Sequence, residues 1–443
     1  MGASVFESPL YDQLFATGEA GRLFSDSAGV RAMLLVEGAL AKVQGALGVI
    51  PELSAAAIHR ASMEVQVDPG ALSEATGQNG VPVPGLVAAF RAEMNAPEHA
   101  AFVHWGATSQ DIIDTALMLR LRQALALAEA DLKTLITSLG TAAEAHAHVP
   151  MVGRTYGQQA TPTTWGGVLA SFGTPLIDAL AQLDDLRDSA LWVSLSGAAG
   201  TASALGPQAA ETRAALARAL GLGDPGRSWH TDRTPILRIA DWQGQVLAPL
   251  GAFGQTLIGL SMSELGEVNL SSAGVSSTMP QKQNPVGPSA LVALNHHFAG
   301  LRSTLGAAAQ HQHQRDGAAW FTEWMAVPGL SLCCAAALQH AKRLADGVTP
   351  RPVHMHAALD GNLGLIHAEA LSFALSETMP RPEAQAITKK LCLEARDKRV
   401  PLKKLAQAAY PQITDAVFDA HANVGTAPDE ALAFAARAKK VAG

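Results

Sequence analysis

The sequence predicts an all-α fold built around a bundle of long helices, and two observations lead to this expectation. Between Asp111 and about Val149, apolar residues recur every three or four positions, with no proline and no glycine until Gly140, as in one continuous helix. Alternation of apolar and polar residues with a period of two, which marks strands, is weak throughout the chain. Aromatic residues, which strands favour, make up only 5% of the chain.

The first predicted long helix carries its apolar residues on one face. Steps of three and four positions connect the members of this stripe, which are Leu117, Leu121, Ala124, Ala128, Leu132, Leu135 and Leu139. At ~1.5 Å per residue, a helix over 111–149 is on the order of 45–55 Å long. A helix of that length needs partners along its whole stripe, and the alanines allow the close approach found in helix bundles.

The rest of the chain divides around this helix. Two further stretches have the composition of long helices, at 165–193 and 235–269. Clusters of proline and glycine predict loops between helices at 77–84, 221–235 and 271–288, with a further break at 347–352. We therefore expect an N-terminal helical domain (1–110), a central long-helix bundle domain with a mobile loop at 271–288 (111–350) and a C-terminal helical domain (351–443).

Composition excludes several classes of protein. The 32 Lys and Arg against 39 Asp and Glu give a net charge of −7, so we expect no nucleic-acid partner. The three cysteines (Cys333, Cys334 and Cys392) form no framework of spaced pairs, which argues against a disulfide-stapled secreted fold. The N-terminus lacks the pattern of a signal peptide, and no uninterrupted apolar run of about 20 residues predicts a membrane span. These features predict a cytoplasmic protein.

Three polar segments that contain glycine or proline interrupt the apolar chain and are candidates for chemistry. The first, 104–111, holds His104, Thr108 and Ser109 just before the first long helix. Hydroxyls and the free N–H groups of a helix N-terminus suit an anion. An ordinary helix cap would account for the same residues.

The second segment, 153–164, precedes the next helical run and contains Arg154, Thr155 and Tyr156. An arginine there can hold a carboxylate through two parallel hydrogen bonds. The alternative is an arginine in a surface loop.

The third segment, 276–285, gathers Ser276, Ser277, Lys282 and Asn284 between prolines. Hydroxyls, one cation and an amide in ten residues are typical of a polar lid that closes over an anionic substrate. The alternative is an exposed linker.

Together the three segments resemble the three signature regions of the fumarase/aspartase (argininosuccinate lyase) superfamily. The third is similar to that family's G-S-S-x-M-P-x-K-x-N-P element, with Val275 in place of a glycine. The resemblance implies a three-domain helical fold, a homotetramer with active sites shared between subunits, and β-elimination or its reverse through an enediolate. It also implies that Ser276 is the carbon acid/base, while Lys282 and Asn284 stabilise the substrate carboxylate.

Departures from the family pattern indicate the branch. Tyr156 stands where the C–N lyases of this superfamily have a histidine, and 76–80 lacks their second catalytic histidine. Those enzymes must protonate a nitrogen leaving group, whereas a carboxylate with a pKa of about 4 leaves without a proton. The chain resembles the lactone-forming cycloisomerases of the superfamily, in which Arg315 would bind a substrate carboxylate.

That resemblance implies closure of 3-carboxy-cis,cis-muconate to 4-carboxymuconolactone in aromatic catabolism. The substrate would be bound by His104, Thr108, Ser109, Arg154, Thr155, Tyr156, Ser277, Asn284 and Arg315, with Ser276 and Lys282 catalytic. Gln283 and Gln314 depart from the family pattern. An adenylosuccinate-lyase-like C–N lyase and a non-catalytic structural homologue remain the alternatives.

We expect no cofactor and no metal. His311 and His313 lie close together, but the sequence offers neither an H-E-x-x-H motif nor an evident third ligand. Cys333 and Cys334 lie in an apolar run and are expected to be small core residues.

Overall fold

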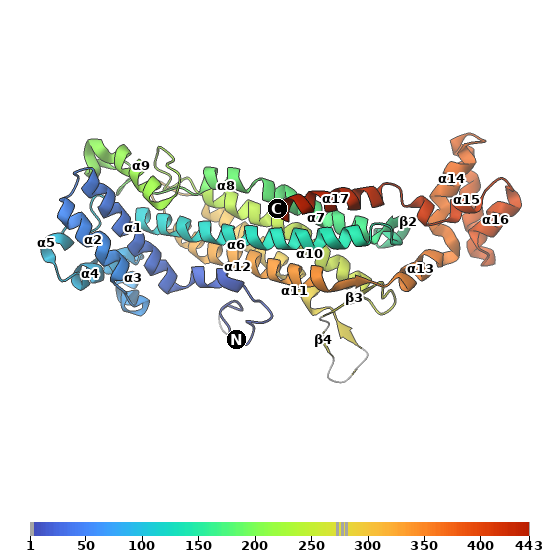
Figure 1. The fold of residues 1–443 in the computed structure, drawn as a ribbon, viewed down its shortest axis with the longest axis horizontal. Coiled ribbons are helices and arrows are strands. Elements are labelled where there is room, and N and C mark those ends of the chain that lie inside the picture. The colour runs from blue at the N-terminus through green and yellow to red at the C-terminus, as the bar shows by residue number, and fades with distance from the viewer. Residues whose placement is uncertain (1–3, 272–273, 276–278, 280–281, 443) are drawn as a thin grey trace. The chain divides into compact units, whose positions relative to one another are not determined.

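The computed structural model describes residues 4–271, 274–275, 279 and 282–442. Helices dominate these residues, which confirms the predicted all-α class (Figure 1). The longest helices are α6 (Ser109–Ala145), α12 (Gly317–Gly347), α10 (Thr234–Leu260) and α11 (Val286–Ala308).

The chain forms two compact units, each assembled from three stretches of sequence. Unit 1 comprises Met1–Ala130, Ala179–Leu247 and Leu294–Gln339, and unit 2 comprises Asp131–Asp178, Ala248–Ala293 and His340–Gly443. Each of the four longest helices contributes residues to both units. The division into domains at 110 and 350 stays a prediction.

Unit 1 holds the N-terminal helices and the start of α6. Its further helices are α1 (Asp26–Ala46), α2 (Glu52–Glu64), α3 (Ser73–Asn79), α4 (Val83–Glu93), α5 (Pro97–Ala100), α8 (Leu183–Ala190) and α9 (Ala209–Leu220) (Figure 1). The Ser25 side chain caps α1 by accepting a hydrogen bond from the Ala28 N–H. Helix α1 packs against α2 and α9, and the same apolar core includes Val36, Val103 and Leu195. This core therefore holds in place the segment around Val103, just before α6, and the segment around Leu195.

Helix α6 confirms the first predicted long helix, although it begins at Ser109 and ends at Ala145, inside the expected end at 149. All seven members of the predicted stripe are buried. The chain thus folds along this stripe as the 3.6-residue period requires.

Unit 2 combines short strands with helices. Strands β1 (Pro150–Thr155) and β2 (Gln158–Thr164) form an antiparallel hairpin, and β3 (Val268–Leu270) pairs antiparallel with β6 (Val348–Pro350). The helices are α7 (Trp165–Ala181), α13 (Pro352–Asp360), α14 (Ala368–Ser376), α15 (Arg381–Lys398), α16 (Leu402–Ala409) and α17 (Ala427–Ala442) (Figure 1). Helices α14 to α16 enclose a small core of their own that includes Leu371, Leu391 and Leu402.

Three expected boundaries are wrong. Residues 77–79 are the last turn of α3 and Gly80 ends it in the left-handed conformation (φ 70°), so the loop expected at 77–84 shrinks to 80–82. The run at 165–193 breaks at Gln182 into α7 and α8. The run at 235–269 ends as a helix at Leu260, where a serine-rich turn at 261–263 stops it.

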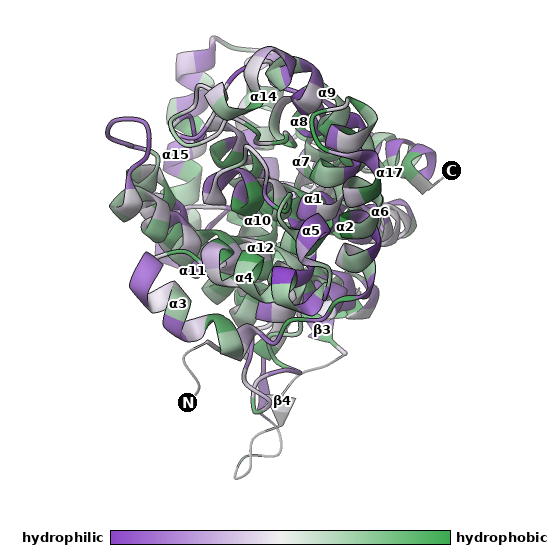
Figure 2. Cartoon of the chain, turned by 90° about the vertical axis from the view of Figure 1, so that its left-hand side faces the viewer, coloured by the Kyte–Doolittle hydropathy of each residue, from purple (hydrophilic) through white to green (hydrophobic). Residues whose placement is uncertain are grey.

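Helix α12 is long and apolar enough to cross a membrane by length and composition, the single such helix in the described ranges. However, 67% of its most apolar window is buried inside the protein, as in the core helix of a soluble protein. Figure 2 shows green apolar residues on α10 and α12 and purple hydrophilic residues on α3 and α5. Cys333 and Cys334 are buried in α12, which confirms them as core residues, and burial raises the pKa of the Cys333 thiol to about 12.

Candidate active site

A tight turn in unit 1 leads into the first residues of α6. His104 (φ 66°) and Gly106 (φ 73°) both have left-handed backbones, and a Cβ on Gly106 would lie 2.4 Å from Leu205 Cδ2. Only glycine fits at position 106 for both reasons. The Thr108 N–H then donates to Asp111 Oδ2 (3.0 Å), as in a capping box, so this first turn of α6 is held in place.

Asp111 connects three segments of unit 1. Its buried carboxylate accepts hydrogen bonds from the Ser194 hydroxyl (3.0 Å) and from the backbone N–H groups of Ser196 (2.8 Å) and Gly197 (2.9 Å). His230 Nε2 lies 2.8 Å from the same carboxylate. A carboxylate with this many donors is firmly oriented, so Asp111 holds 194–197 and His230 against the start of α6.

The predicted substrate ligand Arg315 lies at this same place. Its Nε donates to Gln110 Oε1 (3.0 Å), and its Nη2 donates to Thr108 Oγ1 (3.1 Å) and to the Ala198 carbonyl (3.2 Å). All three acceptors are neutral. The structure therefore brings Thr108 and Arg315 together and orients a guanidinium whose charge these contacts do not neutralise, which suits a ligand carboxylate.

Behind Arg315 lies a buried ionic triad. Arg233 donates to Asp114 (2.7 and 3.1 Å) and to Glu323 (2.7 and 2.8 Å), and all three side chains are fully buried. Burial lowers the pKa of Arg233, but the two carboxylates outweigh it and raise this pKa above its usual value. Gln110 donates to Asp114 Oδ2 (3.2 Å), so the triad orients the side chain that accepts from Arg315.

His104 forms a separate contact with a buried acid. Its Nδ1 lies 2.7 Å from Glu37 Oε1, and Glu37 is buried in α1. Burial lowers the pKa of His104. The hydrogen bond and charge of Glu37, together with the charge of Asp111, outweigh this effect and hold the pKa above its usual 6.5. The pair therefore stabilises the fold below about pH 6.5, and this stabilisation is lost as pH rises through the folded-state pKa.

We expect Glu37→Gln to reduce the free energy of unfolding more at about pH 6 than at about pH 8.5, because the lost partner is that of a protonated His104. Urea titrations of both proteins at both pH values measure the difference. Glu52→Gln, at an exposed position at the start of α2, is the matched control. An equal loss at both pH values would contradict the assignment.

In unit 2, Arg154 at the end of β1 is paired with a carboxylate of its own chain. Its Nη1 and Nη2 donate to the two oxygens of buried Glu267 (2.8 and 2.7 Å). Thr155 ends β1, and Tyr156 and Gly157 form the hairpin turn with φ of 52° and 71°. Positive φ at both central residues is typical of a type I′ turn, and it leaves the Tyr156 side chain fully exposed.

Glu267→Gln should lower the free energy of unfolding by about 1.5–3 kcal/mol. One Arg154 N–H then faces the NH₂ group of the glutamine instead of a carboxylate oxygen, so one charged hydrogen bond is lost. Asp178→Asn is the control, since Asp178 forms an exposed pair with Arg437 that is worth less than about 1 kcal/mol. Urea unfolding of both variants is the measurement. Equal losses would show that the Arg154 pair carries no special weight.

The third segment is described in part. Gly274 pairs with Asn284 and Val275 with Gln283 in a short antiparallel ladder, β4 (Gly274–Val275) with β5 (Gln283–Asn284). Lys282 is exposed and its N–H donates to the Met279 carbonyl (3.0 Å). Asn284 is part-buried, and the expected catalytic Ser276 and its neighbour Ser277 lie outside the described residues.

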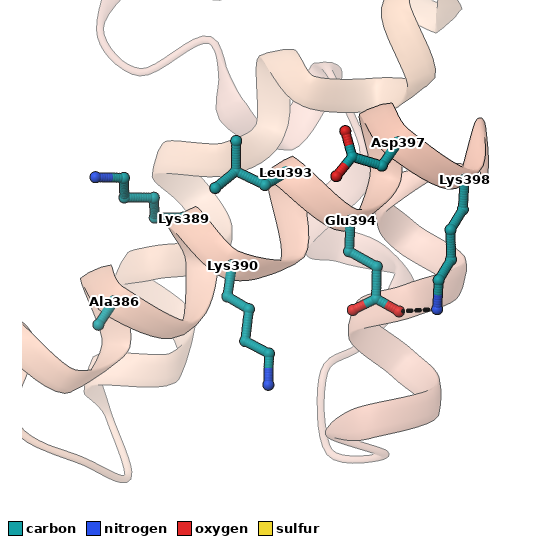
Figure 3. Close-up of a pocket in the computed structure, with 7 residues that line it drawn as sticks. All are labelled: Ala386, Lys389, Lys390, Leu393, Glu394, Asp397 and Lys398. Carbon is teal, nitrogen blue, oxygen red and sulfur yellow. Dashed lines mark hydrogen bonds and ion pairs between the residues drawn. The ribbon is translucent and has the colours of Figure 1, made fainter.

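Two hollows in unit 2 were not expected. One, of about 400 Å³, is lined by Gln283, Arg351 and His354. Gln283 is one of the residues that depart from the family pattern. Another, of about 420 Å³, lies on α15. Figure 3 shows its lining residues Lys389 and Lys390 and the Glu394–Lys398 ion pair (2.7 Å) along one helix. It shares no residue with the predicted site.

No group of three or more His, Cys, Asp or Glu side chains is arranged to hold a metal ion in the part of the chain that the structure describes. Burial and the charge of Arg233 lower the pKa of His311. That the protein needs neither metal nor cofactor stays a prediction.

Comparison with known proteins decides the family. The lyase family model matches residues 17–297, which is more than half of the chain. The chain belongs to the lyase family. The resemblance of its three polar segments to the fumarase/aspartase superfamily is thereby confirmed.

Relatives of this lyase extend over most of its length. It is 39% identical over 399 residues to a 3-carboxy-cis,cis-muconate cycloisomerase of Pseudomonas aeruginosa, covering 89% of this chain and 87% of the relative. It is 38% identical over 392 residues to a 3-carboxy-cis,cis-muconate cycloisomerase of Pseudomonas putida, covering 87% and 93%. The crystal structure of the 3-carboxy-cis,cis-muconate lactonizing enzyme from Pseudomonas putida has a TM-score of 0.91 at 34% identity, covering 98% of this chain and all of that one.

The predicted site residues of this lyase fall into two groups. His104, Thr108, Ser109 and Arg315 belong to unit 1, and Arg154, Thr155, Tyr156, Lys282 and Asn284 belong to unit 2. Within unit 1 the structure brings Thr108 and Arg315 into contact. The roles of all these residues stay predictions.

The residues that organise the site were not predicted as members of it. They are Gln110, Asp111, Asp114, His230, Arg233, Glu267 and Glu323. Asp111 and Asp114 do carry a signal, since two carboxylates one turn apart at the start of a long apolar helix need partners if buried. Glu267 carries no comparable signal, because nothing in the sequence around it indicates that it pairs with Arg154.

Proposed function

We propose that this lyase-family protein is a 3-carboxy-cis,cis-muconate cycloisomerase, which closes its substrate to 4-carboxymuconolactone. The observation that carries the proposal is the likeness to proteins of that name over nearly nine-tenths of the chain. The uncompensated guanidinium of Arg315 supports a substrate rich in carboxylates.

The proposed reaction is an isomerisation within one molecule. One carboxylate oxygen of the substrate adds to a carbon of a C=C double bond, which closes the lactone ring. The π electrons of that double bond move onto the neighbouring carboxylate to give an enediolate. A proton then adds to carbon, so no group leaves and no oxidant is needed. The step that costs most free energy places a second negative charge on a carboxylate, and prearranged cations and N–H donors are the main means of stabilising it.

We assign Ser276 as the proton donor to carbon, as the family resemblance implies. Lys282 and Asn284 would stabilise the enediolate, and Arg315 would bind a second carboxylate. Held by neutral acceptors, Arg315 keeps its full charge for this task, whereas Arg154 is already paired with Glu267. For Arg154 we therefore propose that it fixes the end of β1 and lines the site with Thr155, Tyr156, Ser277, His104, Thr108 and Ser109.

The proposal extends to assembly and location. We propose a homotetramer with active sites shared between subunits, in the cytoplasm. The exposure of Tyr156 and of Lys282 supports shared sites, because exposed side chains are available to a neighbouring subunit. Sedimentation of the purified protein measures the assembly.

Loss of the ultraviolet absorbance of the conjugated diene in 3-carboxy-cis,cis-muconate tests the function, with adenylosuccinate as the parallel substrate. We expect the first to be consumed and the second to remain. Consumption of adenylosuccinate would favour a C–N lyase. Consumption of neither, by a protein with the expected helical circular dichroism, would favour a non-catalytic homologue.

A further inference from the structure

Unit 1 contains a cavity that the proposed function does not use. It has a volume of about 670 Å³, within the range of small-molecule sites. Its walls come from the start of α1, from the segments around α3, from α6 and from α12. Apolar and aromatic side chains predominate, among them Phe24, Val30, Leu72, Leu117 and Trp324.

One cation, Arg120, lines this cavity together with the exposed carboxylate Asp26, which acts on its charge without forming an ion pair. Arg120, on α6, hydrogen bonds to no described residue and forms no ion pair with any described carboxylate within 4.0 Å. Its Nε is buried, and its guanidinium carbon lies 5.9 Å from the centre of the Phe24 ring. Burial lowers the pKa of Arg120, and only the charge of exposed Asp26 opposes this. A half-buried guanidinium in such surroundings gains from an anion that can reach it.

An aromatic cluster forms part of the cavity wall. Trp324 packs against Trp320 and Phe321 in tilted arrangements, at ring-centre distances of 4.7 and 5.1 Å, so its position is fixed. Its indole Nε1 is buried, so the ring lines the cavity with carbon atoms. The cavity thus combines a cation with aromatic walls.

We propose that this cavity is a binding site for a planar, unsaturated or aromatic carboxylate, whose carboxylate pairs with Arg120 and whose body packs between Phe24 and Trp324. Thr108, which contacts Arg315, immediately precedes α6 and lies twelve residues before Arg120, a rise of about 18 Å at the helical spacing. A six-carbon chain with bonds of about 1.5 Å is too short to span that rise. The carboxylate is therefore a second ligand, and the inference does not depend on the proposed function.

Calorimetric titration of the full chain with benzoate and with its uncharged isostere benzamide tests this site. We expect benzoate to bind at least about tenfold more tightly than benzamide, and Arg120→Gln to abolish that preference. Arg120→Lys should restore part of it, because lysine keeps the charge and loses the planar pair of donors. Equal affinity for the two probes in the unaltered protein would overturn the proposal.

Two further variants locate the bound probe. Arg315→Gln should leave benzoate binding unchanged, and loss of binding in this variant but not in Arg120→Gln would place the anion at Arg315 and overturn the proposal. Gly29→Leu should block the cavity, since Gly29 lines it and a Cβ there meets only Arg120 Nη1, at 3.6 Å. Gly29→Ala is its matched control, and both changes favour the helix, so unfolding does not confuse the result. Turnover of 3-carboxy-cis,cis-muconate is measured in a separate assay. Failure of the proposed function can therefore be told apart from failure of the proposed second binding site.

Discussion

Replacing Lys282 with alanine lowers the turnover of 3-carboxy-cis,cis-muconate by about 10²–10³-fold, because one preorganised cation facing the enediolate is removed. Lys282 is exposed, and its hydrogen bond to the Met279 carbonyl is donated by its backbone N–H, which alanine retains, so the fold should not suffer. The expected change is in kcat, measured as the rate of diene absorbance loss at saturating substrate.

Two variants make this result specific. Lys282→Arg keeps the charge and should retain more activity than Lys282→Ala. Lys389→Ala removes a charge from α15, outside the predicted site, and should leave the rate unchanged. An unaltered kcat in Lys282→Ala would remove this lysine from the catalytic machinery.

Replacing Arg233 with methionine lowers the free energy of unfolding by about 3–5 kcal/mol, because Asp114 and Glu323 are then left buried without their cation. The control is Arg302→Met, which breaks an exposed pair with Asp241 and should cost less than about 1 kcal/mol. Urea unfolding followed by circular dichroism compares the two. Similar losses for both variants would mean that the buried triad contributes little.

Helix α6 could be predicted because it follows one rule along its whole length, whereas the runs at 165–193 and 235–269 do not continue as single helices to their expected ends. In α6 every member of the apolar stripe from Leu117 to Leu139 is buried, as the period alone indicates. The β1–β2 hairpin could not be predicted this way. Strand β2 (QQATPTT) is rich in threonine and glutamine, and β1 (PMVGRT) contains an internal glycine. The register of the hairpin depends on two left-handed residues, Tyr156 and Gly157.

The site could be predicted only as far as its polar segments. His104, Thr108 and Arg154 stand out because they interrupt apolar sequence near helices, whereas Arg315 is indicated only by the family resemblance. Their partners depend on contacts between distant stretches, such as Arg154 with Glu267, 113 residues away, and no local pattern encodes such a pair. The cavity at Arg120 was missed because an arginine inside a helical run is usually an exposed surface residue.

The contacts of Asp111 set a limit on how this protein can be re-engineered. One carboxylate fixes Thr108, the stretch 194–197 and His230, which lie on three separate connections of unit 1. Libraries that randomise any of these anchor points would disturb the other two, so selectivity is better varied at 198–206 and 224–228, which lie between the anchors. Grafting a loop from a relative should likewise preserve these five contacts with Asp111 at its ends.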